Sequence, residues 1–184
     1  MSSANSTGPQ LTAEQARFLF NMNASALRSE HQLTKQVIGA IPSDKADYRP
    51  DAVSKSAIEL AWHIVVSERR FLSSIAAGAF DFTPMPRAES LRTTADVLDW
   101  YEKDFSANLQ RLHQLRDEDL LKIIDFRGMF QLPAVLYLNF ILNHTIHHRG
   151  QLSMYLRPMG AKVPSIYGES YDAAQARLAK EGKA

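Results

Sequence analysis

A long apolar run near the C-terminal end of the chain, Leu132 to Leu156, constrains the fold more than any other feature. Its length predicts a helix, and it contains His144 and His148. Residues four apart lie on one face of a helix, so these two imidazoles point the same way, one turn apart. Residues predicted to share their side are Tyr137, Ile141, Gln151, Leu152 and Tyr155. Imidazoles on this apolar side need partners, because burying unpaired polar groups is costly.

Three further stretches of the chain show apolar residues at helical spacing. Thr12 with Gln15 and Ser56 with Glu59 fit capping boxes, and Thr93 or Thr94 can cap a third helix. The four expected helices lie near residues 11–41, 55–78, 93–115 and 132–157. Four long helices joined by moderate loops predict an all-α fold, a four-helix bundle.

Smaller elements are expected around this bundle. Lys122 to Gln131 favours a hairpin that turns at Arg127 and Gly128, because its apolar residues are strand formers. Val163 to Ser170 is expected to be extended, and Tyr171 to Ala179 to form a short helix.

The stripe expected to be buried on the first helix consists of Leu19, Met22, Ala26, Leu33 and Val37. Residues 1–10 are predicted to be a disordered tail, and residues 11–184 a single domain.

Composition excludes several classes of function. The 184 residues carry a net charge of only +1, which gives no reason to expect a nucleic-acid partner. The chain has no cysteine, so disulfides, zinc–thiolate sites and a protein thiol nucleophile are excluded. Leu132 to Leu142 is too short to span a membrane, and Met1 to Gln10 lacks the apolar region of a signal peptide. We therefore expect no membrane partner and a cytoplasmic location.

Three histidines form the candidate functional site. His63 is predicted on the core side of the second helix, and His144 and His148 on the core side of the fourth. Neutral imidazoles are good ligands for zinc, nickel, copper or iron. Three protein ligands leave coordination positions open for water or substrate, as in a catalytic metal site. The alternative is that the three are core or surface histidines satisfied by their neighbours.

Several neighbouring residues are weaker candidates. Glu59 lies one turn before His63 and could orient it, although completing the capping box explains Glu59 equally well. His147, about 60° from the His144 direction, is a candidate for the rim of the site. Tyr155 could contact a substrate, or pack in the core with its hydroxyl outward.

Three more residues near the histidines receive structural roles. Glu68 lies about 140° from His63, so a solvated face or an ion pair is expected. Arg149 is expected to make a helix contact or an ion pair, and Gly150 to permit close helix packing.

These residues resemble a known family. Leu60-Ala61-Trp62-His63, with Ser67-Glu68-Arg69 after it, and His144-Thr145-Ile146-His147-His148-Arg149-Gly150-Gln151 resemble the DinB-like (YfiT-like) family of predicted metalloenzymes. Leu156-Arg157-Pro158-Met159-Gly160 and Val163-Pro164-Ser165-Ile166-Tyr167-Gly168 resemble the end of its fourth helix and the tail that follows. The resemblance covers about Leu11 to Ser170.

The resemblance implies an up-down-down-up bundle, a homodimer and a divalent metal held by His63, His144 and His148. Zinc or nickel is expected, with iron or manganese as alternatives. Relatives include thiol-dependent transferases and a maleylpyruvate isomerase that use low-molecular-weight bacterial thiols. The function expected is therefore a metal-dependent S-transferase or hydrolase acting on a small molecule. The alternative is a non-enzymatic metal-binding or stress-related protein with a structural metal.

Overall fold

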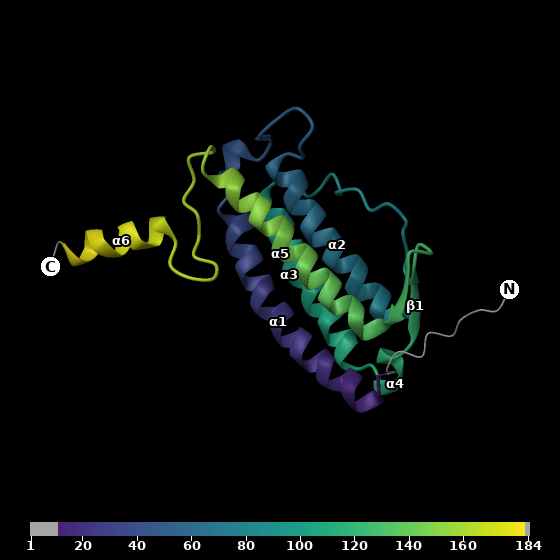
Figure 1. Ribbon diagram of the computed structural model, residues 1–184. Helices are drawn as coiled ribbons and strands as arrows, with labels where there is room; N and C mark the ends of the chain where they lie inside the picture. The colour runs from purple at the N-terminus through teal and green to yellow at the C-terminus, as the bar shows by residue number, and fades with distance from the viewer. Residues whose placement is uncertain (1–10, 183–184) are drawn as a thin grey trace.

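The four predicted helices are present in the computed structural model, which describes residues 11–182. The tail predicted to be disordered, residues 1–10, lies outside the described residues. The four long helices are α1 (Ala13–Gly39), α2 (Ala57–Ala77), α3 (Thr94–His113) and α5 (Tyr137–Leu156). The shorter elements are η1 (Ser43–Lys45), α4 (Asp117–Leu120), β1 (Ile123–Phe126), β2 (Phe130–Pro133), η2 (Ala134–Leu136) and α6 (Tyr171–Glu181). Figure 1 shows how they are arranged.

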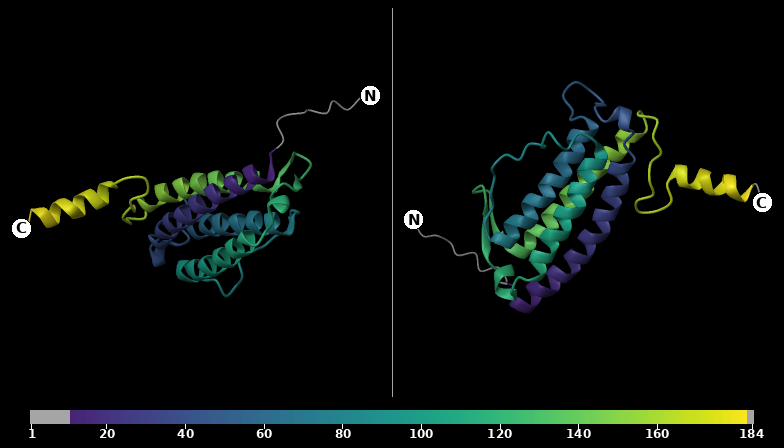
Figure 2. Two further views of the ribbon diagram at one scale, coloured as in Figure 1. Left: turned by 90° about the horizontal axis from the view of Figure 1, so that it is seen from below. Right: turned by 180° about the vertical axis from the view of Figure 1, so that it is seen from behind.

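The bundle has the up-down-down-up order. The segment 79–93 returns along the length of the bundle after α2, so α3 runs in the same direction as α2 (Figures 1 and 2). The helix α5 packs between α1 and α2, and α3 contacts the same two helices from the other side. The predicted all-α four-helix bundle is therefore confirmed.

Local capping explains where the first three long helices begin. The Thr12 hydroxyl accepts from the Gln15 amide at 3.2 Å, and the Gln15 side chain accepts from the Thr12 amide at 2.9 Å. Equivalent boxes join Ser56 with Glu59 and Thr93 with its partner three residues later. Each box satisfies amides that the first helical turn leaves free.

The helix α5 begins differently. Pro133 ends β2 in an extended conformation, and the 3-10 turn η2 precedes the first residue of α5. The fourth helix therefore starts at Tyr137, a few residues later than the sequence predicted. Among the described residues, no helix combines the length and the apolar character that a membrane span requires.

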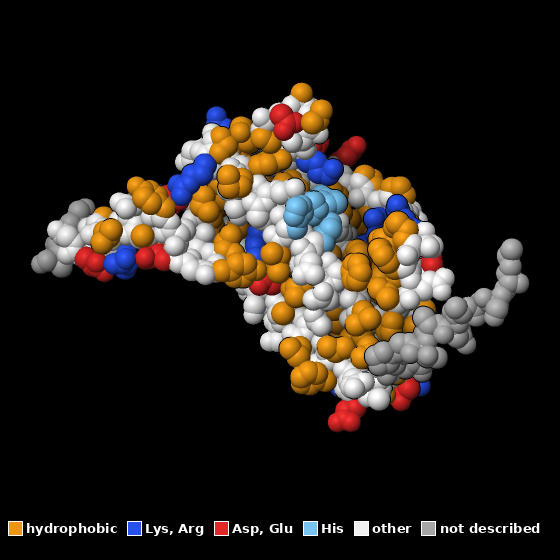
Figure 3. Space-filling view, viewed as in Figure 1, with side chains coloured by type: hydrophobic (Ala, Val, Ile, Leu, Met, Phe, Trp, Pro, Cys, Tyr) orange, Lys and Arg blue, Asp and Glu red, His pale blue; other side chains and the backbone are white. Residues whose placement is uncertain are grey.

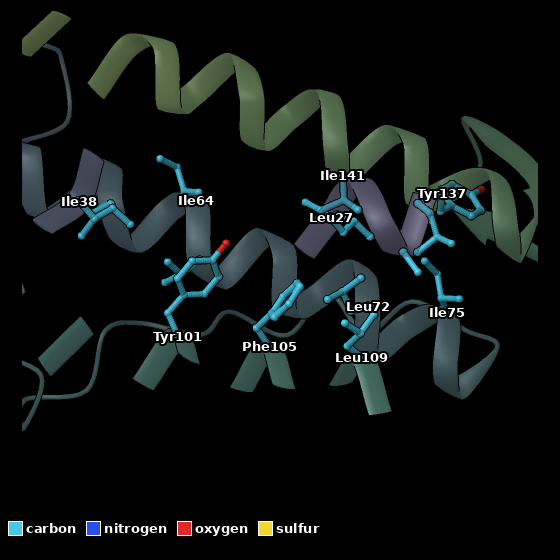
Figure 4. Packing of buried hydrophobic residues seen from close by; sticks show 14 of the residues in the cluster. Leu27, Ile38, Ile64, Leu72, Ile75, Tyr101, Phe105, Leu109, Tyr137 and Ile141 are labelled. Carbon is cyan, nitrogen blue, oxygen red and sulfur yellow. The ribbon is translucent and has the colours of Figure 1, made fainter. Parts of the chain in front are cut away.

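The core lies between the four long helices, as Figure 4 shows. The buried stripe of α1 differs from the predicted one, since Met22 is 57% exposed and Leu19, Ala26 and Leu33 are only half-buried. The buried residues of this helix are Ala16, Phe20, Ala24, Leu27, His31, Thr34, Val37 and Ile38. Two apolar stripes lie side by side on α1, and the buried one includes the polar residues His31 and Thr34.

The hairpin and the C-terminal helix match their predictions. β1 and β2 pair antiparallel, with Phe126 opposite Phe130, and the turn between them contains Arg127 and Gly128, both at positive φ. The hydroxyl of Tyr137 donates to the Ile124 carbonyl at 2.8 Å, which ties the hairpin to α5. The helix α6 projects away from the bundle and has no buried residue (Figure 2). The short helix α4 was not predicted.

Candidate metal centre

The three histidines of the sequence analysis converge on one point. His63 lies on α2, and His144 and His148 lie on α5, which packs against α2. Each offers one ring nitrogen, and these three atoms all lie within 4.8 Å of one another. The Nε2 atoms of His63 and His148 are 3.2 Å apart. Two nitrogens bound tetrahedrally to one zinc ion would be about 3.3 Å apart, so the spacing of this pair suits a shared ion.

The three histidines lie at the edge of the core, not on the core-facing sides of α2 and α5 as the sequence predicted. All three side chains are half-buried. The buried positions of α2, such as Ile64 and Leu72, are centred about 140° from His63 around the helix axis. The predicted core-side placement is therefore corrected to the shoulder where α2 meets α5. A shoulder position leaves the imidazoles reachable from solvent.

The imidazoles of the cluster are held in the neutral form. Burial lowers the pKa of His63 to about 4, with further lowering by His148 and by the charge of Lys55. Burial also lowers the pKa of His144 to about 4, and the neighbouring histidines act in the same direction. The pKa of His148 is lowered as well, mainly by burial. Neutral imidazole is the form that binds metal, so the environment prepares these side chains as ligands.

The hydrogen bonds of the cluster also fit a metal ion. The Oε1 atom of Gln151 accepts from Nδ1–H of His148 at 2.7 Å, which leaves the lone pair of Nε2 free toward His63. Such an outer partner fixes the tautomer of a metal-binding histidine. The Nδ1 atom of His144 is buried without a hydrogen-bond partner. A buried nitrogen without a partner is unusual, and coordination of an ion is one way in which an imidazole is satisfied.

The cluster opens into a cavity of about 470 Å³ between α2, α5 and the loop that joins α1 to α2. His63 and His148 form part of its wall, and Leu60, Met154 and Tyr155 supply apolar surface. Figure 3 shows the pale-blue histidine side chains gathered on this face, with a basic group beside them and apolar groups around. The volume is in the usual range for small-molecule sites, roughly 300–1,000 Å³.

The weaker candidates have different fates. Glu59 caps α2 and pairs with Arg49 at 2.9 Å, and it is not among the residues that line the cavity. His147 is exposed, and its ring meets the edge of His148 with 4.9 Å between centroids. Tyr155 lines the cavity, a position from which contact with a substrate remains a prediction.

Glu68 is buried, although a solvated face or an ion pair was expected. It lies one turn after Ile64, at the centre of the core-facing stripe of α2. Its carboxylate accepts from the Thr145 hydroxyl at 3.3 Å and lies 3.8 Å from Nδ1 of His31. The predicted solvated face is wrong because it assumed that His63 points toward the core. A residue about 140° from His63 instead lies on the buried side of α2.

His31 was not singled out from the sequence, and it is buried on α1, stacked on Phe105 at 3.9 Å. Its spacing from Leu27 and Phe20 on the buried stripe could have identified it. His31, Glu68 and Thr145 thus form a buried polar cluster inside the bundle.

Arg149 makes the ion pair that was expected of it. Its side chain is 1% exposed and pairs with Glu30, while Nη2 donates to the Tyr167 hydroxyl at 2.6 Å. Gly150 does not serve close helix packing, because a Cβ atom placed there would meet nothing within 4 Å. That expectation is corrected: Gly150 faces solvent.

A helical bundle with three neutral histidines close together, two of them lining a cavity, defines a class of helical proteins suited to bind a metal ion. The chain belongs to the DinB family, which it matches over residues 19–182. It is 31% identical over 145 residues to the uncharacterized protein YjoA of Bacillus subtilis, covering 76% of this chain and 90% of YjoA. It is 28% identical over 144 residues to the uncharacterized protein YrdA of the same organism, covering 76% and 82%.

Solved structures agree with this assignment. The crystal structure of YjoA, a DinB-like protein, superposes with a TM-score of 0.66 and 26% identity, covering 81% of this chain and 99% of that one. A DinB-like protein from Bacillus cereus gives the same TM-score and identity, with 79% and 95% covered. The family resemblance inferred from the two histidine motifs is therefore confirmed.

Proposed function

We propose that this protein is a metal-dependent enzyme acting on a small molecule, with His63, His144 and His148 as the metal ligands. The observation that carries the proposal is a group of three neutral imidazoles, two of which, His63 and His148, line an open cavity. Zinc or nickel suits these nitrogen ligands best, with iron or manganese as alternatives. A bound ion would lower the pKa of a thiol or a water molecule at its free positions.

The protein's own residues supply binding and orientation. Gln151 holds the ring of His148 in the tautomer that presents Nε2 to the site. Leu60, Met154 and Tyr155 give the cavity apolar walls, which exclude water from a small organic substrate. In the leading reaction, the sulfur of a small thiol forms a bond to an electrophilic carbon. The group displaced from that carbon departs with its bonding electrons, and the thiol proton passes to solvent.

Two alternatives remain as competing proposals. A metal-assisted hydrolase would use the same ligands with water in place of the thiol. A non-enzymatic protein with a structural metal would need a closed site, which for zinc normally means four protein ligands. In the part of the chain that the structure describes, the only group of metal-ligating side chains contains three residues and borders a cavity. This supports an open, reactive site over a closed one.

The test combines elemental analysis with an activity screen. Purified protein should hold about one divalent ion per chain and should conjugate low-molecular-weight thiols to electrophilic substrates. Replacing His148 by Ala should remove a ligand, and with it the metal and the activity, without unfolding the bundle. His113 lies outside the cluster, and its Nε2 atom is hydrogen-bonded to Nη2 of Arg28 at 2.7 Å, so His113→Ala is the matched control. Full metal content in the His148→Ala protein would overturn the ligand assignment.

A metal-loaded wild type that converts neither thiols nor hydrolysable esters would favour the structural alternative.

A further inference from the structure

The cavity beside the three-histidine cluster carries one side chain that is charged at neutral pH. This is Lys55, in the loop that leads into α2, and no carboxylate is among the residues that line the cavity. Arg49, from the same loop, is paired with Glu59 at 2.9 Å. Within residues 11–182 no ion pair engages Lys55 in the same way. The cavity therefore has a positive charge that is not neutralised by the protein.

The charge of Lys55 acts on the histidine cluster itself. It contributes to the lowered pKa of both His63 and His148, although burial is the larger cause in each. Lys55 thus lies close enough for its field to reach two of the three imidazoles. A small molecule that touches the cluster would lie within reach of the same charge.

The N-terminus of α2 does not offer a competing anion site. Ser56 and Glu59 satisfy each other's amides through the capping box, at 2.8 and 3.3 Å. The amides of Ala57 and Ile58, which lie between these two residues, donate to carbonyl oxygens of the preceding loop at 2.9 Å. Free amides are what make a helix N-terminus bind anions. The charge available to a ligand in this cavity is therefore the ammonium group of Lys55.

We propose that Lys55 binds the carboxylate of a small organic acid whose other end reaches the three-histidine cluster. This inference rests on the proposed function and names its substrate class: a compact anion with an apolar body. Leu60 and Met154 contact the body, and Lys55 fixes the charged end. An ammonium–carboxylate pair is a charge-assisted hydrogen bond, about twice as strong as a neutral one. Lys55 is thereby the residue that selects acids over neutral molecules of the same size.

The experiment compares two thiols that differ in charge. Zinc-loaded full-length protein is titrated calorimetrically with mercaptopropionate and with mercaptopropanol, which replaces the carboxylate by a hydroxymethyl group. The wild type should bind the acid roughly tenfold more tightly than the alcohol, as expected for one hydrogen bond to a charged group. Lys55→Met should bring the ratio close to one and leave the affinity for the alcohol unchanged. Lys55→Arg should restore most of the preference.

The controls separate Lys55 from the metal. Lys103→Met makes the same change of net charge on the exposed side of α3 and should leave the ratio as in the wild type. Zinc content should be equal in all variants. If Lys55→Met keeps the full preference for the acid, the carboxylate is bound by the ion alone and the inference is overturned. It is equally overturned if the wild type shows no preference or binds neither thiol.

A metal-free arm keeps this inference distinct from the proposed function. If the purified protein holds no metal, the proposed function fails, and the carboxylate site is then tested with propionate. Propionate should shift the NMR signals of the His63 and His148 rings in the wild type, and this response should be lost in Lys55→Met. Absence of a response in the wild type, or its persistence in Lys55→Met, overturns the inference.

Discussion

Replacing Gln151 should weaken metal binding although Gln151 is not itself a proposed ligand. Its Oε1 atom accepts the Nδ1–H of His148 at 2.7 Å and so keeps the lone pair of Nε2 directed into the cluster. Outer partners of this kind typically contribute 10–100-fold to metal affinity, about 1.4–2.7 kcal/mol. His148 is only half-buried, so water can replace part of the lost bond. We therefore expect Gln151→Leu to weaken zinc binding about tenfold, at the lower end of that range.

A second substitution at Gln151 should change the zinc affinity in the opposite direction. A carboxylate accepts the same Nδ1–H more strongly than an amide and makes the imidazole a better donor. Gln151→Glu should therefore tighten zinc binding relative to the wild type. Affinities are measured near neutral pH by competition with a chromophoric chelator, with His113→Ala as the control that should not change.

Two results would refute this account. Unchanged affinity in Gln151→Leu would show that the Gln151 bond does not set the tautomer of His148. Equal weakening in Gln151→Leu and Gln151→Glu would show that Gln151 acts through its shape rather than as a hydrogen-bond acceptor.

Four further outcomes are expected. Arg149→Met should destabilise the fold by about 3 kcal/mol, the lower end of the range for breaking a buried pair, because Glu30 loses its ion-pair partner but is only partly buried and keeps the Tyr167 hydroxyl as a donor; chemical denaturation checks this, and removing both charges should recover much of the loss. Gly150→Ala should stabilise the protein by about 0.5–1 kcal/mol, since a Cβ atom meets nothing there and a helical glycine is entropically costly; a lower melting temperature would contradict this. The metal-free protein should lose stability as pH falls from about 6.5 to about 4, because the unfolded chain takes up protons that the three-histidine cluster, with its lowered pKa values, refuses; a flat pH profile of unfolding in that window would count against neutral histidines. We also propose that the chain forms a homodimer through exposed apolar side chains of α1 and α5. Light scattering that finds only monomer at micromolar concentration would disprove this proposal.

Much of the fold could be predicted because its determinants are local. The capping boxes at Thr12 and Ser56 predict where α1 and α2 begin, because each box involves only residues that are three apart in the sequence. Gly78, at φ 71°, ends α2 in the left-handed conformation that glycine adopts without strain. The start of α5 was harder to place, because Pro133 belongs to a strand whose pairing depends on residues ten positions earlier.

The candidate site was predictable in composition but not in orientation. A spacing of four places His144 and His148 on one side of α5 whatever the rest of the chain does. His63 joins them only because α2 packs against α5, which is a tertiary fact. Angles around a helix axis give relative directions, and they do not say where the core lies. Glu68 shows the consequence: of its two predicted roles, the solvated face is wrong because the side chain is buried, and its charged neighbour is His31 at 3.8 Å.

The helix α5 separates the residues that hold the fold from those that form the site. Its core side carries the fully buried Leu138, Ile141 and Leu152, whose removal would open cavities in the bundle. His144 and His148 lie half-buried beside that core side, with 4.4 Å between their ring centroids. Changes at the shoulder can therefore alter metal affinity and ligand choice while the packing that orients α5 stays intact. Because the three proposed ligands, including His63 on α2, are only half-buried, we expect their replacement to remove the metal without unfolding the protein.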